Sequence, residues 1–325
     1  MGSGNVNHAN RVASQLYWMA RHIERAENAA RTLDVTYRMS LLPYRVMEQG
    51  ESWAEPWAVP LITNGLVVSY YKRHPGPLTP ANVLRYMVLD PQNPSSIYSS
   101  LYAARESARS VRDAITSEMY EDLNAAWLEL RGTNEQMVTG DGISRFFDWV
   151  KMRSHQFRGV TFGTMLRDEG YRFIRLGGFV ERADNTARIL DVKYHVLLPS
   201  VDDVGGAVDY YQWSALLRSV SAFESYRRIY RDVIVPRRVA ELLILRDDVP
   251  RSLHYCMNEI TGILDEMDER GSNEPRRLAG ELHAKLHYGR AEEIIGLGLH
   301  EYLMAFLSGI NRLGGEINKH FFSPS

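Results

Sequence analysis

Apolar residues recur every three or four positions along two long stretches of the chain, the spacing that places them on one face of an α-helix. The first stretch carries Leu16, Met19, Ile23, Ala26, Ala30, Leu33 and Tyr37. The second carries Phe173, Val180, Ala183, Ala187, Leu190 and Tyr194. No Asn-Gly or Asp-Gly turn joins two alternating stretches, since Asp141-Gly142 is followed by residues with helical spacing. We therefore expect an all-α protein.

The two helical stretches are copies of one sequence, which indicates an internal repeat. Residues 23–37 read IERAENAARTLDVTY and residues 180–194 read VERADNTARILDVKY, so ten of the fifteen aligned positions are identical at an offset of 157. Further matches follow at an offset of 156, among them Trp57 with Trp213. We interpret the pattern as a tandem duplication of a unit of about 155 residues.

The duplication predicts two domains with a boundary near residue 160. We assign residues 10–160 to the first helical repeat and residues 161–322 to the second. We expect two helical bundles packed side by side around a pseudo-twofold axis. Thr79-Pro80 is expected to begin a shorter helix, with the threonine as N-cap and the proline at the first helical position. Loops are predicted near 44–56, 74–79, 132–141, 200–206 and 268–275.

A band of polar residues lies beside the apolar face in both copies when the sequence is placed on a helical wheel. In the first copy it consists of Glu24, Glu27, Asn28, Arg31 and Asp34. In the second it consists of Glu181, Asp184, Asn185, Arg188 and Asp191. The wheel places Arg25 and Arg182 on the far flank of the helix, away from this band. Together these residues are the predicted ligand- or partner-binding set.

The band has a structural and a functional interpretation. Structurally, Glu27–Arg31 and Asp184–Arg188 are spaced i,i+4 for helical salt bridges worth about 0.2–0.5 kcal/mol each. Arg31–Asp34 is spaced i,i+3 for a further contact. The strongest structural interpretation is a buried polar network that joins the two copies. Salt bridges leave Asn28 unexplained, because asparagine is unfavourable in the middle of a helix. If the two long helices face each other, two Glu–Asn–Arg sets would form a chamber for an amino acid, a short peptide or an acyl phosphate.

Composition narrows the chemistry further. The 38 basic and 40 acidic side chains nearly cancel, which disfavours nucleic-acid binding. A single cysteine, Cys256, excludes an intrachain disulfide and a cysteine-based zinc site. His283 and His287 are spaced i,i+4, but Ala284 stands where a zinc-protease motif needs glutamate, so we interpret the pair as a helix face. A di-iron Glu-x-x-His motif, a P-loop and a dinucleotide fingerprint are all missing, and we predict no metal and no cofactor in this chain.

The pattern of hydrophobicity gives no sign of export or membrane insertion. The N-terminal residues lack the apolar core of a signal peptide. No apolar run approaches the roughly 20 residues that a membrane-spanning helix needs. We therefore expect a cytoplasmic protein without membrane contact.

The first copy resembles the bacterial alpha-E family, a group of predicted helical proteins named for a Glu-Arg motif. The matching string is SQLYWMARHIERAENAARTLDV, which contains Glu24-Arg25, and the second copy has Glu181-Arg182 within FVERADNTARILDV. The resemblance covers nearly the whole chain. The segment YWMAR of the first copy has no echo in the second, where the corresponding residues read IRLGG. This departure implies two unequal sites, of which the first is the better candidate.

The resemblance also implies a partner. Genes of the family sit beside, or are fused to, a circularly permuted ATP-grasp ligase, often with a transglutaminase-like peptidase. The implied role is in making or attaching peptides through ATP-dependent amide bonds, with ATP and Mg²⁺ bound to a ligase that acts in trans.

Our leading hypothesis is a non-enzymatic or weakly catalytic accessory protein that binds the ligase, or its amino-acyl or peptide substrate, through the doubled motif. One alternative is a free-standing acyl or aminoacyl transferase with Glu24 as general base, in which Glu181 is the second candidate catalytic residue. The other alternative is a purely structural helical adaptor.

Overall fold

The computed structural model describes residues 3–40, 56–140, 142–196, 207–267 and 273–323, and every regular element in these ranges is helical. This confirms the predicted all-α class. The first half contains α1 (Ser3–Ser40), α2 (Val59–Thr63), α3 (Val67–Arg73), α4 (Pro80–Leu84), α5 (Ile97–Ser110), α6 (Ser117–Arg131), α7 (Glu135–Thr139) and α8 (Ile143–Thr164). The second contains α9 (Glu169–Val196), α10 (Ala207–Ser219), α11 (Phe223–Tyr230), α12 (Pro236–Ala240), α13 (Leu253–Met267), α14 (Glu274–His287), α15 (Ala291–Leu297) and α16 (Leu299–Ile317).

Each half of the described chain has eight α-helices in succession; a 3-10 turn (Pro56–Ala58) also precedes α2, and a π-helical turn (Asn318–Phe322) follows α16. A π-helical turn follows α4 at Arg85–Leu89, and another follows α12 at Glu241–Leu245, at the offset of 156 found in the sequence. A tandem duplication predicts this repetition, and the duplication itself stays a prediction. The predicted boundary between residues 160 and 161 falls inside α8, and the connection to α9 runs over residues 165–168.

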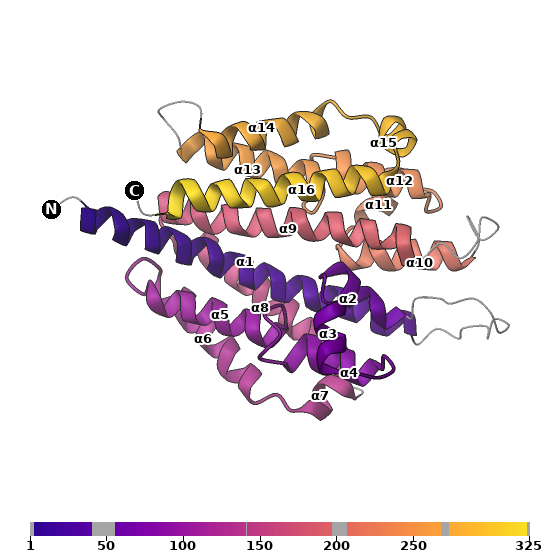
Figure 1. The fold of residues 1–325 in the computed structure, drawn as a ribbon, viewed down its shortest axis with the longest axis horizontal. Coiled ribbons are helices and arrows are strands. Elements are labelled where there is room, and N and C mark those ends of the chain that lie inside the picture. Colours follow the sequence, from indigo (N-terminus) through magenta and orange to yellow (C-terminus); the bar gives the residue numbers. More distant parts are fainter. Residues whose placement is uncertain (1–2, 41–55, 141, 197–206, 268–272, 324–325) are drawn as a thin grey trace.

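The two long helices, α1 and α9, run across the middle of the molecule (Figure 1) and pack along each other. Helices α5 and α8 cover α1 on one side, and α13 and α16 cover α9 on the other. The halves also exchange contacts, because α2 packs on α9 and α10 packs on α1. The bundles therefore lie side by side and are interlocked at the same time.

The predicted apolar stripe of α1 is buried from Leu16 to Leu33, and that of α9 from Phe173 to Leu190. Each large aliphatic side chain that is fully buried contributes about 1.5–3 kcal/mol to folding. Burial in α1 extends beyond the stripe, since Ala29 and the polar residues beside it are also enclosed. Other helices thus cover both long helices on more than one face, and little of the surface of α1 is exposed to solvent.

The predicted caps and loops are matched in part. The side chain of Thr79 accepts a backbone hydrogen bond at the start of α4, and residues 74–79 before it are not helical. Helix α7 forms within the predicted loop 132–141, because the side chain of Asn134 caps the N-terminus of this short helix. The remaining predicted loops fall wholly or largely on residues outside the described ranges: 44–56, 200–206 and 268–275.

Taken one at a time, the helices of the described ranges are too short or too polar to cross a membrane. One pair, α15 with residues 299–322, reaches the required length and composition together, and its two members are bent by 99° relative to each other. The apolar face of α16 is directed inward, with Leu303 and Leu313 fully buried against the rest of the protein.

The backbones of α1 and α9 approach closely at Gly177. A Cβ atom added at Gly177 would overlap the carbonyl group of Tyr17 in α1, whereas a Cβ added at the neighbouring Gly178 would meet no atom within 4 Å. The absence of a side chain at Gly177 therefore sets the distance between the two long helices.

We expect Gly177→Ala to lower the free energy of unfolding by about 1–3 kcal/mol, because α1 and α9 must separate to admit the methyl group. Gly178→Ala is the matched control and should raise stability by up to about 1 kcal/mol, since alanine is the better helix former. Urea unfolding followed by circular dichroism measures both. Equal stability of the two variants would contradict the close approach.

Candidate functional site

The Glu-Arg motifs of the two halves pair with each other where α1 and α9 meet. Glu24 accepts hydrogen bonds from Nε and Nη2 of Arg182, both at 3.0 Å. Glu181 accepts hydrogen bonds from Nε and Nη2 of Arg25, at 2.6 and 3.0 Å. Two-pronged contacts of this kind are the strongest form of the carboxylate–arginine bond. The pairing is reciprocal, as across a twofold axis, so the doubled motif joins the two halves.

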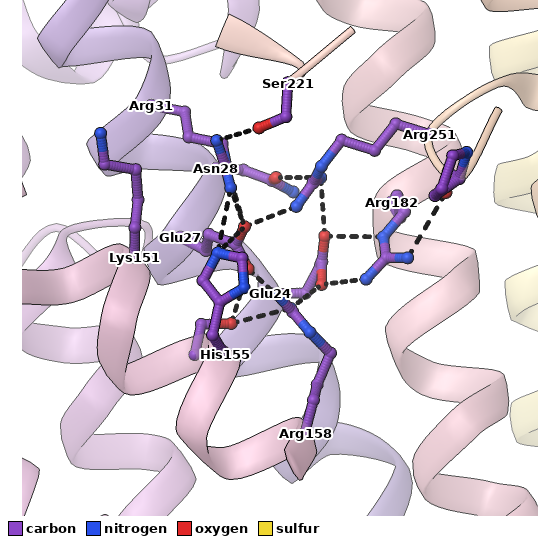
Figure 2. Close-up of polar contacts among 12 residues, drawn as sticks. Glu24, Glu27, Asn28, Arg31, Lys151, His155, Arg158, Arg182, Ser221 and Arg251 are labelled. Atoms are coloured by element: carbon purple, nitrogen blue, oxygen red, sulfur yellow. Dashed lines mark hydrogen bonds and ion pairs between the residues drawn. The ribbon is translucent and has the colours of Figure 1, made fainter. Parts of the chain in front are cut away.

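A larger cluster surrounds the carboxylates of the first copy (Figure 2). Arg158 of α8 places Nη1 2.9 Å from Glu24 and 2.6 Å from Glu27. Arg251, just before α13, donates to Glu24 at 2.9 Å and to Glu27 at 2.6 Å. Arg31 completes the set with a 2.8 Å bond from Nε to Glu27, the i,i+4 pair expected from the sequence. Arginines from three separate segments therefore converge on two neighbouring carboxylates of α1.

Positive charge exceeds negative charge in this cluster. Glu24 and Glu27 face four guanidinium groups, those of Arg31, Arg158, Arg182 and Arg251. Burial alone would raise the pKa of Glu24, but the arginine charges outweigh it and lower the pKa to about 2. The pKa of Glu27 is lowered well below its usual value in the same way. Both carboxylates are ionised at neutral pH, so the cluster keeps a formal surplus of two positive charges.

Asn28 has a structural explanation. Its side-chain oxygen accepts a 3.1 Å hydrogen bond from Nη1 of Arg251, which holds that guanidinium against Glu24. Ser154 of α8 donates to Glu27 at 2.6 Å and accepts from Arg158, so it serves the same cluster from the opposite side. A polar side chain in the middle of α1 is therefore stabilised by an arginine that the sequence analysis did not identify.

Arg31 and Asp34 diverge instead of pairing as their i,i+3 spacing predicted. Arg31 reaches the second half, where Nη1 donates to Ser221 at 2.5 Å. Asp34 binds Arg38 and Lys151, both at 3.0 Å. The prediction of an Arg31–Asp34 contact was wrong because Arg31 bonds to the carboxylate of Glu27 instead, and Asp34 has two other cations as partners.

The second copy does not build a matching cluster. Glu181 gains one more arginine, Arg21, at 2.7 Å, and Arg21 lies over the ring of Trp18. Burial would raise the pKa of Glu181, but Arg21 and Arg25 lower it to about 2. Away from this group, Asp184 forms its predicted i,i+4 pair with Arg188 and Asp191 contacts His300, while Asn185 is half-buried.

The positions predicted for Arg25 and Arg182 need correction. The helical wheel placed both on a far flank, yet they form the centre of the contact between α1 and α9. The wheel assumes that a helix has one covered face, and these two helices are covered on several.

The sequence analysis also missed Arg158 and Arg251. At the offset of 156 their counterparts are Gly314 and Ser95, so a search for shared residues could not find them.

A half-open cavity of about 380 Å³ lies beside the cluster, between α1, α8 and α9. Its charged end is formed by Glu24, Arg158 and Arg182. Arg158 is the accessible member, with 34% of its side chain exposed, against 3% for Glu24. Aromatic side chains supply much of the remaining wall: Phe157, Phe162, Tyr171 and Phe179.

The two halves differ at an aligned position that lines the cavity. Gly178 lines the cavity, and the residue aligned with it in α1 at the offset of 157 is Arg21. On that side the guanidinium of Arg21 occupies the space beside Glu181. The first Glu-Arg site is therefore open to a ligand, and the second is filled by the protein's own arginine.

We expect Glu24→Gln to lower the free energy of unfolding by about 3–5 kcal/mol, because it leaves the buried Arg182 without its carboxylate partner and removes one of the two carboxylates that face Arg251. Glu106→Gln, at a surface ion pair, is the control and should change little. Denaturant unfolding of both variants checks this. A Glu24→Gln protein as stable as the Glu106→Gln control would show that the motif does not hold the halves together.

We also expect acid to weaken the fold over a defined range. Glu24 and Glu181 have pKa values of about 2 in the folded protein against an ordinary 4.5, so their ionisation favours the folded state. This stabilisation is complete above pH 4.5 and is lost as the pH falls towards 2. Urea unfolding between pH 5 and pH 3 should give a shallower pH dependence for Glu181→Gln than for the unchanged chain. An identical dependence would contradict the assignment.

Comparison with known proteins places the chain among helical proteins that carry the same motif. Three uncharacterized proteins, one from Mycobacterium bovis and one each from two strains of Mycobacterium tuberculosis, are 24% identical to it over 320 residues. The match covers 93% of this chain and 35% of each relative, so the chain spans about a third of their length. No solved structure matches. A family model described as a predicted alpha-helical domain with a conserved ER motif matches residues 9–322, and the chain therefore belongs to the Alpha-E family.

Proposed function

We propose that this chain is an accessory protein of an ATP-grasp amide ligase, and that it holds the ligase's amino-acid or peptide substrate in the cavity beside Glu24. The observation that carries the proposal is the combination of an exposed arginine, an aromatic wall and a surplus of positive charge in one half-open cavity. The Glu-Arg motif then has a supporting role, since its carboxylates hold the arginines in place.

Arg158 is the residue best placed to contact a substrate. Only its Nη1 is used by Glu24, Glu27 and Ser154, and its Nε and Nη2 have no hydrogen-bond partner among the described residues. A guanidinium with free N–H groups binds a carboxylate or a phosphate in two-pronged fashion. ATP-grasp ligases activate a carboxylate as an acyl phosphate, so both anions occur in the proposed reaction.

The aromatic wall suits the remainder of such a ligand. Tyr171 and Phe179 come from α9, and Phe157 and Phe162 come from α8. Arg175 also lines the cavity, where it bonds to Glu259 and lies near the rings of Tyr171 and Phe179. A short peptide or an amino acid with an apolar side chain matches this division into a charged end and an apolar wall.

The lengths of the relatives support a role beside a second protein. In the mycobacterial proteins the region similar to this chain makes up about a third of a longer polypeptide. By analogy, we propose that this chain also acts next to another component.

The low pKa and the hydrogen bonds of Glu24 weaken the alternative that the protein is a transferase. A carboxylate with a pKa of about 2 that accepts hydrogen bonds from three arginines is a weak base. Cys256, the single cysteine, is fully buried, and burial raises its pKa to about 12, so it is not a nucleophile. The chemistry of the cavity therefore favours binding over catalysis.

The experiment is affinity co-purification of the tagged chain from its native cells, followed by mass spectrometry and an assay of amide-bond formation in the recovered complex. We expect an ATP-grasp ligase at comparable stoichiometry. Arg158→Lys keeps the charge beside Glu24 and Glu27 but loses the two-pronged geometry. It should raise the KM for the carboxylate substrate about tenfold or more, as expected for a weakened bond to a charged group.

The matched control is Arg145→Lys, an exposed arginine on the same helix α8, which should leave the KM unchanged. Recovery of no ATP-grasp ligase would contradict the partnership. Recovery of the ligase with equal KM values for the Arg158→Lys complex and the unchanged complex would show that the cavity does not hold the substrate.

A further inference from the structure

Three histidines from neighbouring helices meet on the side of the second half where α13 and α14 pack together. They are His254 of α13 and His283 and His287 of α14. One ring nitrogen of each lies within 4.8 Å of the corresponding nitrogens of the other two. The three ring centroids form an equilateral triangle with sides of 5.5 Å. This group is separate from the Glu-Arg cluster and from the cavity beside it.

His254 is prepared to act as a ligand. Its Nδ1 lies 2.7 Å from the carbonyl oxygen of Leu245, and because a carbonyl oxygen only accepts, Nδ1 carries the proton. The lone pair is then on Nε2. The residue is 95% buried, and Nε2 has no hydrogen-bond partner in the described part of the chain. A buried nitrogen with a free lone pair that faces two other imidazoles is unfavourable unless something binds it.

The two histidines of α14 complete the set. Nε2 of His283 donates to the side-chain oxygen of Asn258 at 2.6 Å, which leaves the lone pair on Nδ1. His287 follows one helical turn later and is exposed, so the group is open to solvent at one edge. Metal-binding histidines usually give their second ring N–H to a carbonyl or carboxylate oxygen, and His254 and His283 both have such an acceptor.

The spacing fits one ion among the rings. The centre of the triangle lies about 3.2 Å from each centroid (5.5 Å divided by √3). That distance leaves about 2 Å between the centre and a nitrogen at the ring edge, the length of a Zn–N bond. The χ2 angle of histidine rotates within a broad range, which allows each nitrogen to turn towards the centre.

We propose that His254, His283 and His287 bind a divalent transition-metal ion, with Zn²⁺ as the best match. Three neutral imidazoles suit zinc, copper and nickel, and they leave a further coordination position for water or another ligand. The proposal does not rest on the cavity or on the partner ligase. The sequence analysis treated His283 and His287 as a helix face because the third histidine lies on a different helix.

The site is close to the Glu-Arg cluster along the chain. Arg251 lies three residues before His254, and Ser252 between them donates to the carbonyl oxygen of Arg246. An ion bound to His254 would fix the first turn of α13 against α14. The segment that contains Arg251 would then be held by the Ser252–Arg246 hydrogen bond and by the ion at His254.

The test is metal binding by the full chain after removal of any polyhistidine tag. We expect titration with Zn²⁺ to show one high-affinity ion per chain. Titration with Co²⁺ should give the visible absorption of a four-coordinate site, and Zn²⁺ should displace it. Absence of stoichiometric binding of both ions would overturn the proposal.

Variants locate the ion. His287→Ala changes an exposed residue and should lower the Zn²⁺ affinity at least tenfold, and His283→Ala with His287→Ala should abolish stoichiometric binding. Asn258→Ala removes the acceptor behind His283 and should lower the affinity roughly ten- to a hundredfold. His320→Ala, at an exposed histidine elsewhere, is the control. A double variant with unchanged circular dichroism that binds Zn²⁺ like the unchanged chain would also overturn the proposal.

Discussion

A carboxylate that moves from water into a protein interior loses hydration that only close cations and hydrogen-bond donors can replace. Glu24, Glu27 and Glu181 are all enclosed where α1 meets α9, and their cations come from other parts of the fold. Arg158 belongs to α8, and Arg251 precedes α13. Both of these segments must be in place before the charges of Glu24 and Glu27 are fully compensated. The compensation of buried charge therefore fixes how the segments of the two halves are placed around the long helices.

The same constraint explains how a repeated motif gives two different sites. The crossed Glu-Arg pairs are reciprocal and need only the residues that both halves share. The additional cations differ, since Arg21 fills the space beside Glu181 whereas Gly178 leaves space beside Glu24. The proposed binding cavity thus reflects a difference between the halves, and the motif is the part that they share. A function assigned to the motif alone would miss the residue that faces solvent, Arg158.

Local features of the sequence predicted a good deal of the structure. The helical class and the buried stripes follow from spacing within single helices, and the repeat drew attention to both Glu-Arg pairs. The rest depends on contacts between segments that no local pattern connects. Arg158 and Arg251 have no counterparts in the other half, and His254 joins His283 and His287 only because α13 packs on α14. Arg25 was misplaced because a wheel describes one helix and not its neighbours.

The residues of the cluster lie far apart in the sequence, and this separation has a consequence for folding during synthesis. Arg251 follows Glu24 by 227 residues. At roughly 5–20 residues per second, the ribosome adds Arg251 about 11–45 s after Glu24. Helix α1 therefore leaves the ribosome before the segments that enclose it, and it cannot reach its final enclosure until those segments have emerged. During that interval its apolar stripe is available to water or to the chaperones that hold nascent chains.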